Sequence, residues 1–165
     1  MSMLTNPRQT ILVTCRAHLK SKFADHNEIK DNIITLDWHM PTSFSPTLYA
    51  ISVGKTRYSV NLIKKSNVFV VNFMPINLKD KVLFCGRNSG EIMDKFKESG
   101  LHKEEAETID CPRITEALGY LECEVINQIE TGDHILFVGK ITKSNQKSEG
   151  KRVFHTEGDN FKTIE

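Results

Sequence analysis

The sequence predicts a mainly β domain with a few short helices, arranged around a β-barrel. Many short runs of β-branched and aromatic residues are separated by turn residues, as in all-β folds. Only a few segments show helical spacing, and no long helices alternate with the strands as they do in a doubly wound α/β sheet. A chain of 165 residues fits one domain, which we expect to span residues 1–165.

The overall composition excludes several classes of protein. Hydrophobic residues make up 39% of the chain and charged residues 26%, which supports a globular core. The formal net charge of +1 gives no basic field typical of nucleic-acid binding. No apolar run approaches the roughly 20 residues of a membrane helix, and residues 1–10 lack the apolar core of a signal peptide. We therefore expect a cytoplasmic protein without a nucleic-acid partner or membrane contact.

Strand-like runs occur at both ends of the chain and in its centre. A polar stretch at 17–31 predicts a loop or an irregular hairpin, and the two prolines within 41–46 predict a turn. Gly132 and its neighbours predict the turn of a hairpin. The expected strands are Gln9–Cys15, Asn32–Met40, Thr47–Val53, Val68–Phe73, Tyr120–Ile129, Ile135–Ile141, Arg152–His155 and Phe161–Ile164.

Three short segments have helical spacing. The acidic and polar segment 102–112 follows them and is expected to lie outside the barrel. Gly86 and Gly100 come just after the second and third segments, where glycine often ends a helix. The expected helices are Arg57–Lys65, Leu78–Cys85 and Glu91–Ser99.

The spacing of the cysteines does not predict a metal site, and the common cofactor-binding motifs are absent. No CxxC pair is present, so neither zinc binding nor thioredoxin-type chemistry is supported, and we expect reduced thiols. The sequence also lacks GxGxxG and GxxxxGK[ST], so a cofactor would have to be held in another way. The cysteines are Cys15, Cys85, Cys111 and Cys123.

The first candidate site is the segment Lys55–Ser59, which follows a predicted strand and opens a predicted helix. The backbone N–H groups of a helix start and the helix dipole favour an anion. Thr56 and Ser59 add hydroxyl donors, while Lys55 and Arg57 add positive charge. The segment therefore suits a phosphate group. The alternative is an ordinary capped helix with two solvated cations.

The second candidate site lies around Trp38, the only tryptophan. Along a strand, Asn32 and Trp38 share one face, while Thr35 and Asp37 share the other. Trp38 is suited to cover the plane of a bound ring, or it is a core or dimer-interface aromatic. Thr42 and Ser43, just past this strand, are suited to hydrogen-bond a polar heterocycle, or they serve ordinary turn chemistry.

The third candidate is Ser89-Gly90 with Asp94-Lys95-Phe96, and the fourth is His134. Lys95 is expected on a short polar helix, where it reaches an anion or is a solvated surface lysine. His134 follows the predicted hairpin turn and is suited to bind a phosphate, to donate a hydrogen bond, or to lie idle at the rim. On this reading, truncation of either side chain costs little stability.

Taken together, six segments resemble the flavin reductase family, which includes flavoredoxins, archaeal ferric reductases and the reductase components of two-component monooxygenases. The resemblance runs from Pro7 to Thr142 and is weaker over Phe154–Ile164. The segments are SFSP (43–46), TLYAISVG (47–54), RYSVNLI (57–63), FCGRNSG (84–90), DKF (94–96) and GDHILFVGKI (132–141).

The resemblance implies a homodimeric, FMN-binding split β-barrel of Greek-key type with the flavin near the subunit interface. Arg57, Tyr58 and Ser59 match the phosphate and ribityl segment, while Lys95 and His134 match positions that reach the flavin or its nicotinamide partner. One departure is Asp37, where many members have a small or hydroxyl residue. The resemblance leaves open whether Phe161 contacts the cofactor. The residues that it places around the flavin ring are Asn32, Thr35, Trp38, Thr42 and Ser43.

The implied function is that of an FMN-containing oxidoreductase in which the flavin carries the chemistry. In the first reading, NADH or NADPH supplies a hydride and the electrons pass to free flavin or ferric iron. In the second, the protein is a flavoredoxin-like carrier that receives electrons from a protein donor. In the third, it is a flavin-binding module without turnover. The sequence leaves the donor and the physiological acceptor open.

Overall fold

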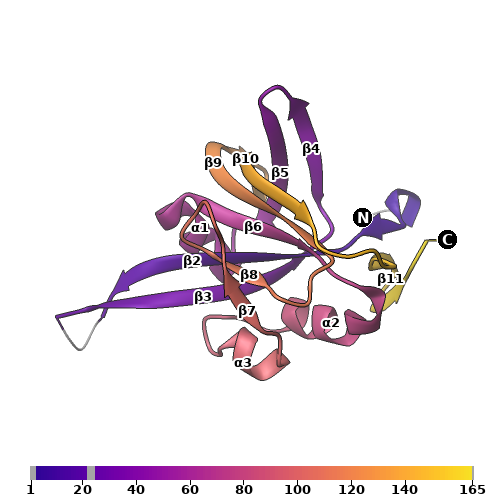
Figure 1. Cartoon of the computed structure of the whole chain (residues 1–165), viewed down its shortest axis with the longest axis horizontal. Helices are drawn as coiled ribbons and strands as arrows, with labels where there is room; N and C mark the ends of the chain where they lie inside the picture. The colour runs from indigo at the N-terminus through magenta and orange to yellow at the C-terminus, as the bar shows by residue number, and fades with distance from the viewer. Residues whose placement is uncertain (1–2, 22–24, 165) are drawn as a thin grey trace.

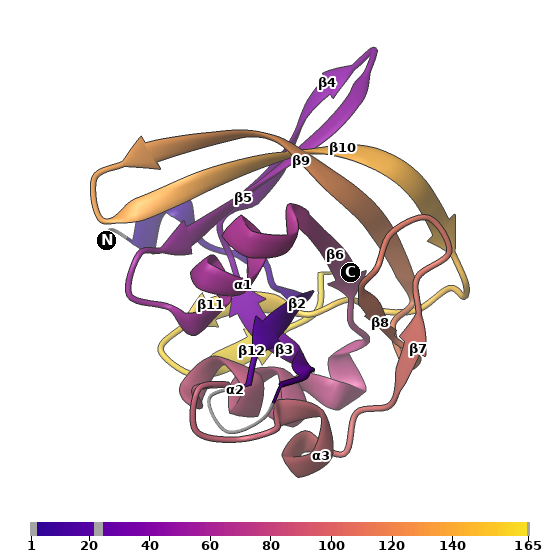
Figure 2. The same cartoon turned by 90° about the vertical axis from the view of Figure 1, so that its left-hand side faces the viewer.

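A single curved, seven-stranded antiparallel sheet forms the centre of the computed structural model, which describes residues 3–21 and 25–164 (Figures 1 and 2). Its strand order is β3-β2-β6-β9-β10-β5-β4. The end strands β3 and β4 are not paired with each other within these residues, so the barrel is open, as expected for a split barrel. The strands are β2 (Ile11–Lys20), β3 (Asn27–Leu36), β4 (His39–Phe44), β5 (Thr47–Gly54), β6 (Val68–Phe73), β9 (Gly119–Thr131) and β10 (His134–Gln146).

Two hydrophobic cores lie on the two faces of strand β2, because side chains alternate along a strand. Ile11 and Val13 face the inside of the curve, where helix α1 (Tyr58–Ser66) packs through Leu62 and Ile63. Leu12 faces the other side, toward helices α2 (Lys79–Arg87) and α3 (Lys95–Ser99). Figure 2 shows α1 within the curve and α2 and α3 beyond strands β2 and β3. The second half of strand β3 is therefore covered by helices on both faces, whereas its first residues are exposed.

The three predicted helices are present, with corrected ends. Helix α1 lies within one residue of its predicted range and is followed by Asn67 in the left-handed conformation, at φ 57°. Gly86 does not end α2, which continues to Arg87. Helix α3 starts at Lys95, later than predicted, because the Asp94 carboxylate accepts a hydrogen bond from the Lys97 N–H and caps it there.

Two segments predicted as irregular are extended strands. Much of the polar stretch 17–31 belongs to the long β2–β3 hairpin, whose register pairs Ala17 with Lys30 and Lys20 with Asn27. The predicted turn at 41–46 is mostly strand β4, and the strand expected over 32–40 ends at Leu36. Pro41 is tolerated in β4 because β4 is an edge strand, where one side needs no hydrogen-bond donors.

The remaining strands form two small sheets. The acidic segment 102–112, predicted to lie outside the barrel, contains β7 (Lys103–Glu105), which pairs with β8 (Pro112–Ile114). The third sheet is β1 (Arg8–Gln9), β11 (Phe154–Glu157) and β12 (Asn160–Lys162), so it joins both ends of the chain. Short 3-10 turns occupy Met3–Thr5 and Ile76–Leu78. Within the described residues, every helix is too short or too polar to cross a membrane.

Candidate functional site

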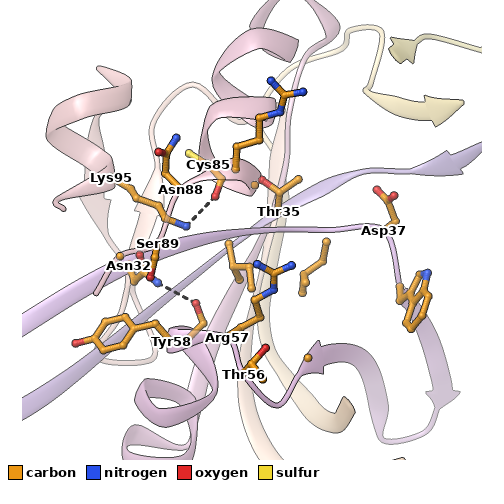
Figure 3. A pocket seen from close by; sticks show the side chains of 18 of the residues that line it. Asn32, Thr35, Asp37, Thr56, Arg57, Tyr58, Cys85, Asn88, Ser89 and Lys95 are labelled. Carbon is orange, nitrogen blue, oxygen red and sulfur yellow. Dashed lines mark hydrogen bonds between the residues drawn. The ribbon is translucent and has the colours of Figure 1, made fainter. Parts of the chain in front are cut away.

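A cavity of about 380 Å³ opens between strand β3, the start of α1 and the segment that joins α2 to α3 (Figure 3). Figure 3 shows Lys95, Ser89 and Asn32 at one end of the cavity and Asp37 at the other. Ten of the twelve predicted site residues line it, although they come from four separate segments of the chain. These are Asn32, Thr35, Trp38, Thr56, Arg57, Tyr58, Ser59, Ser89, Lys95 and His134.

The other two predicted residues, Thr42 and Ser43, lie on strand β4 and do not line this cavity. Strands β4 and β5 form a hairpin that projects from the sheet (Figures 1 and 2). Phe44, at the tip of this hairpin, is 99% exposed. Within one subunit the two hydroxyl residues are therefore separated from the rest of the predicted site.

The start of α1 places one of its two predicted cations, Arg57, in the cavity wall, which we call the electropositive wall. Arg57 has extended backbone angles, makes no side-chain cap and lines the cavity. The first turn of the helix contains no acidic residue, so the helix dipole there is not offset from within the turn. Lys55 does not contribute, because its Nζ lies 2.9 Å from a carboxylate oxygen of Glu130, away from the cavity.

Asn32 and Ser59 form a buried polar pair in the cavity wall. The Asn32 Nδ2 donates a hydrogen bond of 2.9 Å to the Ser59 Oγ, and both residues are almost fully buried. The Asn32 Oδ1 is buried and has no hydrogen-bond partner in the structure. Gly90 packs directly on this amide, since a Cβ at position 90 would lie 1.9 Å from Oδ1. The Asn32 Oδ1 is therefore an unpaired acceptor enclosed against Gly90 in the cavity wall, and such groups are rare in folded proteins.

Lys95 is buried, which corrects the prediction that its truncation costs little stability. Its side chain lines the cavity, and the residue is only 4% exposed. The Nζ donates to the backbone carbonyls of Ile33 (2.8 Å) and Cys85 (2.7 Å), so it joins α3 to β3 and α2. Burial lowers the pKa of Lys95, and the charges that act on it do not include a carboxylate. An anion in the cavity would offset this cost of burying the ammonium.

Two aromatic rings lie at another side of the cavity. Trp38 and His134 have ring centroids 4.6 Å apart at an interplanar angle of 32°. The His134 Nδ1 lies 2.6 Å from an Asp133 carboxylate oxygen, which orients the ring. Helix α2 positions Thr35, because the Thr35 hydroxyl donates a hydrogen bond of 2.7 Å to the Val82 carbonyl. The Thr35 hydroxyl proton is thus used within the fold.

Asp37 also lines the cavity, and two distant residues hold its carboxylate. The Thr10 hydroxyl donates to Oδ1 at 2.6 Å, and the His155 Nδ1 lies 2.7 Å from Oδ2. Phe161 does not line the cavity but lies against His155, with ring centroids 5.6 Å apart. Local sequence gives no signal for these contacts, because the partners are far apart along the chain.

Sequence reasoning missed the wall formed by the end of α2. Cys85, Gly86, Arg87, Asn88 and Gly90 all line the cavity. They belong to the FCGRNSG segment, in which the sequence predicts a site only at Ser89 and Gly90. Burial raises the pKa of the Cys85 thiol to about 11, so it is protonated at neutral pH. All four cysteines are free and buried, consistent with the expected reduced thiols.

The fold and the cavity define a class of protein: an open antiparallel barrel whose cavity is lined by one buried cation, Lys95, by two exposed arginines and by several hydrogen-bonding groups. The chain belongs to the flavin reductase-like family, because the family model for the flavin reductase like domain matches residues 3–163.

The similar solved structures share the observed fold, and a relative is similar in sequence over most of its length. An uncharacterized protein of Archaeoglobus fulgidus is 38% identical over 144 residues, which cover 81% of each chain. The FMN-binding protein from Thermus thermophilus with bound p-hydroxybenzaldehyde is 21% identical and has a TM-score of 0.85, covering 99% of this chain and 89% of that one. The flavin reductase HpaC complexed with NADP+ is 18% identical, with a TM-score of 0.78 and coverage of 98% and 93%.

Proposed function

We propose that this protein binds FMN in the cavity and uses NADH or NADPH to reduce flavin or ferric iron. The observation that carries the proposal is the buried Lys95 ammonium, which lines the cavity beside the unpaired Asn32 Oδ1. Together they call for a ligand that carries negative charge and also donates a hydrogen bond. FMN has a phosphate, ribityl hydroxyl groups and a ring N–H, so the residues present fit this cofactor.

The phosphate would lie against the electropositive wall. Arg57 and the start of α1 provide charge and backbone donors, as in other helix N-termini that bind phosphate. Lys95 adds a second cation from α3. A single phosphate is therefore matched by two cations and one helix start, which favours FMN over riboflavin.

The flavin ring would extend toward Trp38 and His134, which offer flat surfaces of the size of an aromatic heterocycle. Asn32 and Thr35 would border the ring. When bound, FMN supplies hydride and electron transfer, while the chain supplies orientation and charge. Lys95 and Arg57 would favour the more negatively charged form of the ligand.

We further propose that two copies of the chain associate through the β4–β5 hairpin. Met40 and Phe44 expose apolar side chains on this projecting hairpin, an arrangement that favours contact with another protein surface. Association would cover them and would let Thr42 and Ser43 reach the partner's cavity, where they would border a flavin ring as the resemblance places them. Sedimentation tests the proposal: a flavin-loaded monomer at micromolar concentration would contradict it.

The decisive experiment is anaerobic reduction of the purified protein. We expect a yellow protein whose FMN absorbance bleaches on addition of NADH or NADPH, with electrons recovered in added free flavin or ferric chelate. Bleaching by a reduced ferredoxin-type protein but by neither nucleotide would instead favour the flavoredoxin-like carrier. FMN that binds but is reduced by none of these donors would favour a non-catalytic module. Failure to bind FMN would refute the proposal.

A further inference from the structure

Arg87 is a third cation in the cavity wall, and it stands apart from the other two. It is the last residue of α2, whereas Arg57 precedes α1 and Lys95 begins α3. Figure 3 shows Cys85 and Asn88, which flank the Arg87 region, facing Thr56 and Arg57 across the cavity. A single phosphate bound at the start of α1 does not require a cation on this second wall.

The Arg87 guanidinium is paired with Asp159, a residue of the turn between β11 and β12. The two side chains are 60% and 56% exposed. Exposed ion pairs of this kind contribute little to stability. An anionic ligand can therefore replace the Asp159 carboxylate at small cost, and a guanidinium suits phosphate oxygens because its donors bind two of them at once.

The hairpin that carries Asp159 is held in place by other contacts. Strand β11 pairs with β1 through Gln9 and Arg8, and His155 lies 2.7 Å from the Asp37 carboxylate. Release of Arg87 by Asp159 would leave these contacts intact. The exchange would thus be a local side-chain event and would not require the hairpin to unfold.

We propose that Arg87 binds the diphosphate of a pyridine dinucleotide that enters the cavity beside FMN, and that Asp159 competes with this diphosphate for the guanidinium. The proposal rests on the proposed function, since it assumes that FMN occupies the wall formed by Arg57 and Lys95. It assigns Arg87 to affinity for the electron donor, and it makes Asp159 a residue that weakens this affinity.

The test measures dissociation constants on the FMN-loaded protein by calorimetry, with NAD+ and NADP+ as the dinucleotides. Arg87→Ala should weaken their binding at least fivefold, whereas Asp159→Asn should strengthen it at least twofold. Nicotinamide riboside, which lacks phosphate, should bind equally to all variants. Lys79→Ala removes the same charge from an exposed position at the other end of α2 and should have no effect.

Changes of opposite sign in dinucleotide affinity for the two variants would distinguish a binding role of Arg87 from a structural one. Loss of a stabilising ion pair would change the affinity in the same direction for both variants. Equal dinucleotide affinities across the variants, or weakening by both, would overturn the inference. A parallel titration of apo-protein with FMN and FAD tests the other diphosphate source. If Arg87→Ala lowers only FAD affinity, the donor assignment is wrong. If the wild-type protein does not retain FMN, the proposed function itself fails.

Discussion

Two groups of buried charges in this protein differ in how they are neutralised. Glu122 is fully buried beneath the segment 103–114, and it accepts hydrogen bonds from the Thr108 hydroxyl, two backbone N–H groups and Arg113. In the cavity, by contrast, Lys95 is buried against backbone carbonyls only, and Asn32 leaves an acceptor unpaired.

The contrast separates a structural cluster from a binding site. A buried charge that the chain itself pairs with an opposite charge is complete without a ligand, and its removal affects stability alone. A buried charge with partial compensation gains from a ligand of opposite sign. Variants in the two regions should therefore differ in whether they change stability, FMN affinity or both.

The largest expected effect is the loss of stability in Glu122→Gln. This change takes the buried carboxylate from Arg113, which keeps the more exposed Glu104 and Glu107; breaking a buried pair costs up to about 3–5 kcal/mol. Urea unfolding measures the loss, and FMN affinity of the folded fraction should stay within about twofold of wild type. A comparable loss of FMN affinity would show that the two regions are coupled and would remove the contrast.

The same variant tests the pH dependence. Burial alone would raise the pKa of Glu122, but hydrogen bonds from Thr108, the neighbouring N–H groups and Arg113 lower it overall. A carboxyl with a lowered folded pKa stabilises the protein above its unfolded pKa, which is about 4.3, and loses that contribution as the pH falls through the folded value. The difference between wild type and Glu122→Gln should therefore shrink below about pH 4.

The next largest effect is expected for Gly90→Ala. The added Cβ would overlap the Asn32 Oδ1 and displace the amide from its bond to Ser59. FMN affinity should fall about a hundredfold or more, equivalent to roughly 2.8 kcal/mol. Gly54→Ala is the control, because its Cβ would meet Arg57 at an ordinary contact distance of 3.6 Å. Flavin fluorescence titration measures both; similar losses would indicate general crowding of the cavity.

Lys95→Met should lower both FMN affinity and stability. The change removes a cation from the cavity and leaves the Ile33 and Cys85 carbonyls unpaired. A charged hydrogen bond contributes about 1.5–3 kcal/mol, so FMN affinity should fall at least tenfold, with a lower melting temperature. Lys97→Met, at an exposed position of the same helix, should change neither quantity. A normal FMN affinity for Lys95→Met would assign Lys95 a structural role only.

Arg57→Ala should discriminate between two flavins. Loss of the guanidinium should weaken FMN binding about tenfold through a lost charged hydrogen bond, while riboflavin, which lacks phosphate, should bind almost unchanged. Lys55→Ala removes a neighbouring cation that is paired with Glu130 and should have little effect on either ligand. Equal losses for FMN and riboflavin would place the phosphate elsewhere.

The smallest expected effects belong to His134→Ala. The residue is partly exposed at the start of β10 and contacts Trp38 and Asp133, so the melting temperature should stay within a few degrees. If His134 contacts the nicotinamide partner, the apparent KM for NADH or NADPH rises and FMN affinity is unchanged. If it contacts the flavin, FMN affinity falls first. No change in either quantity would make His134 an idle rim residue.

The sequence by itself predicted strands at 68–73, 120–129 and 135–141, which the structure contains as β6 and within the longer β9 and β10, and it predicted helix α1 after β5. These features depend on local periodicity and on turn residues such as Gly132, which has φ 63°. The motifs also identified the family and ten residues of the cavity wall. Local patterns suffice there because each segment carries its own signal.

Only the tertiary structure decided how these segments complete one another. The burial of Lys95, the contact of Gly90 with Asn32 and the pairing of Arg87 with Asp159 join residues from separate elements. A lysine on a short polar helix has the same local sequence whether it faces solvent or a cavity. Its environment is set by what packs against it, and here strand β3 and helix α2 enclose Lys95 and change its role from a solvated charge to a buried cation at the candidate site.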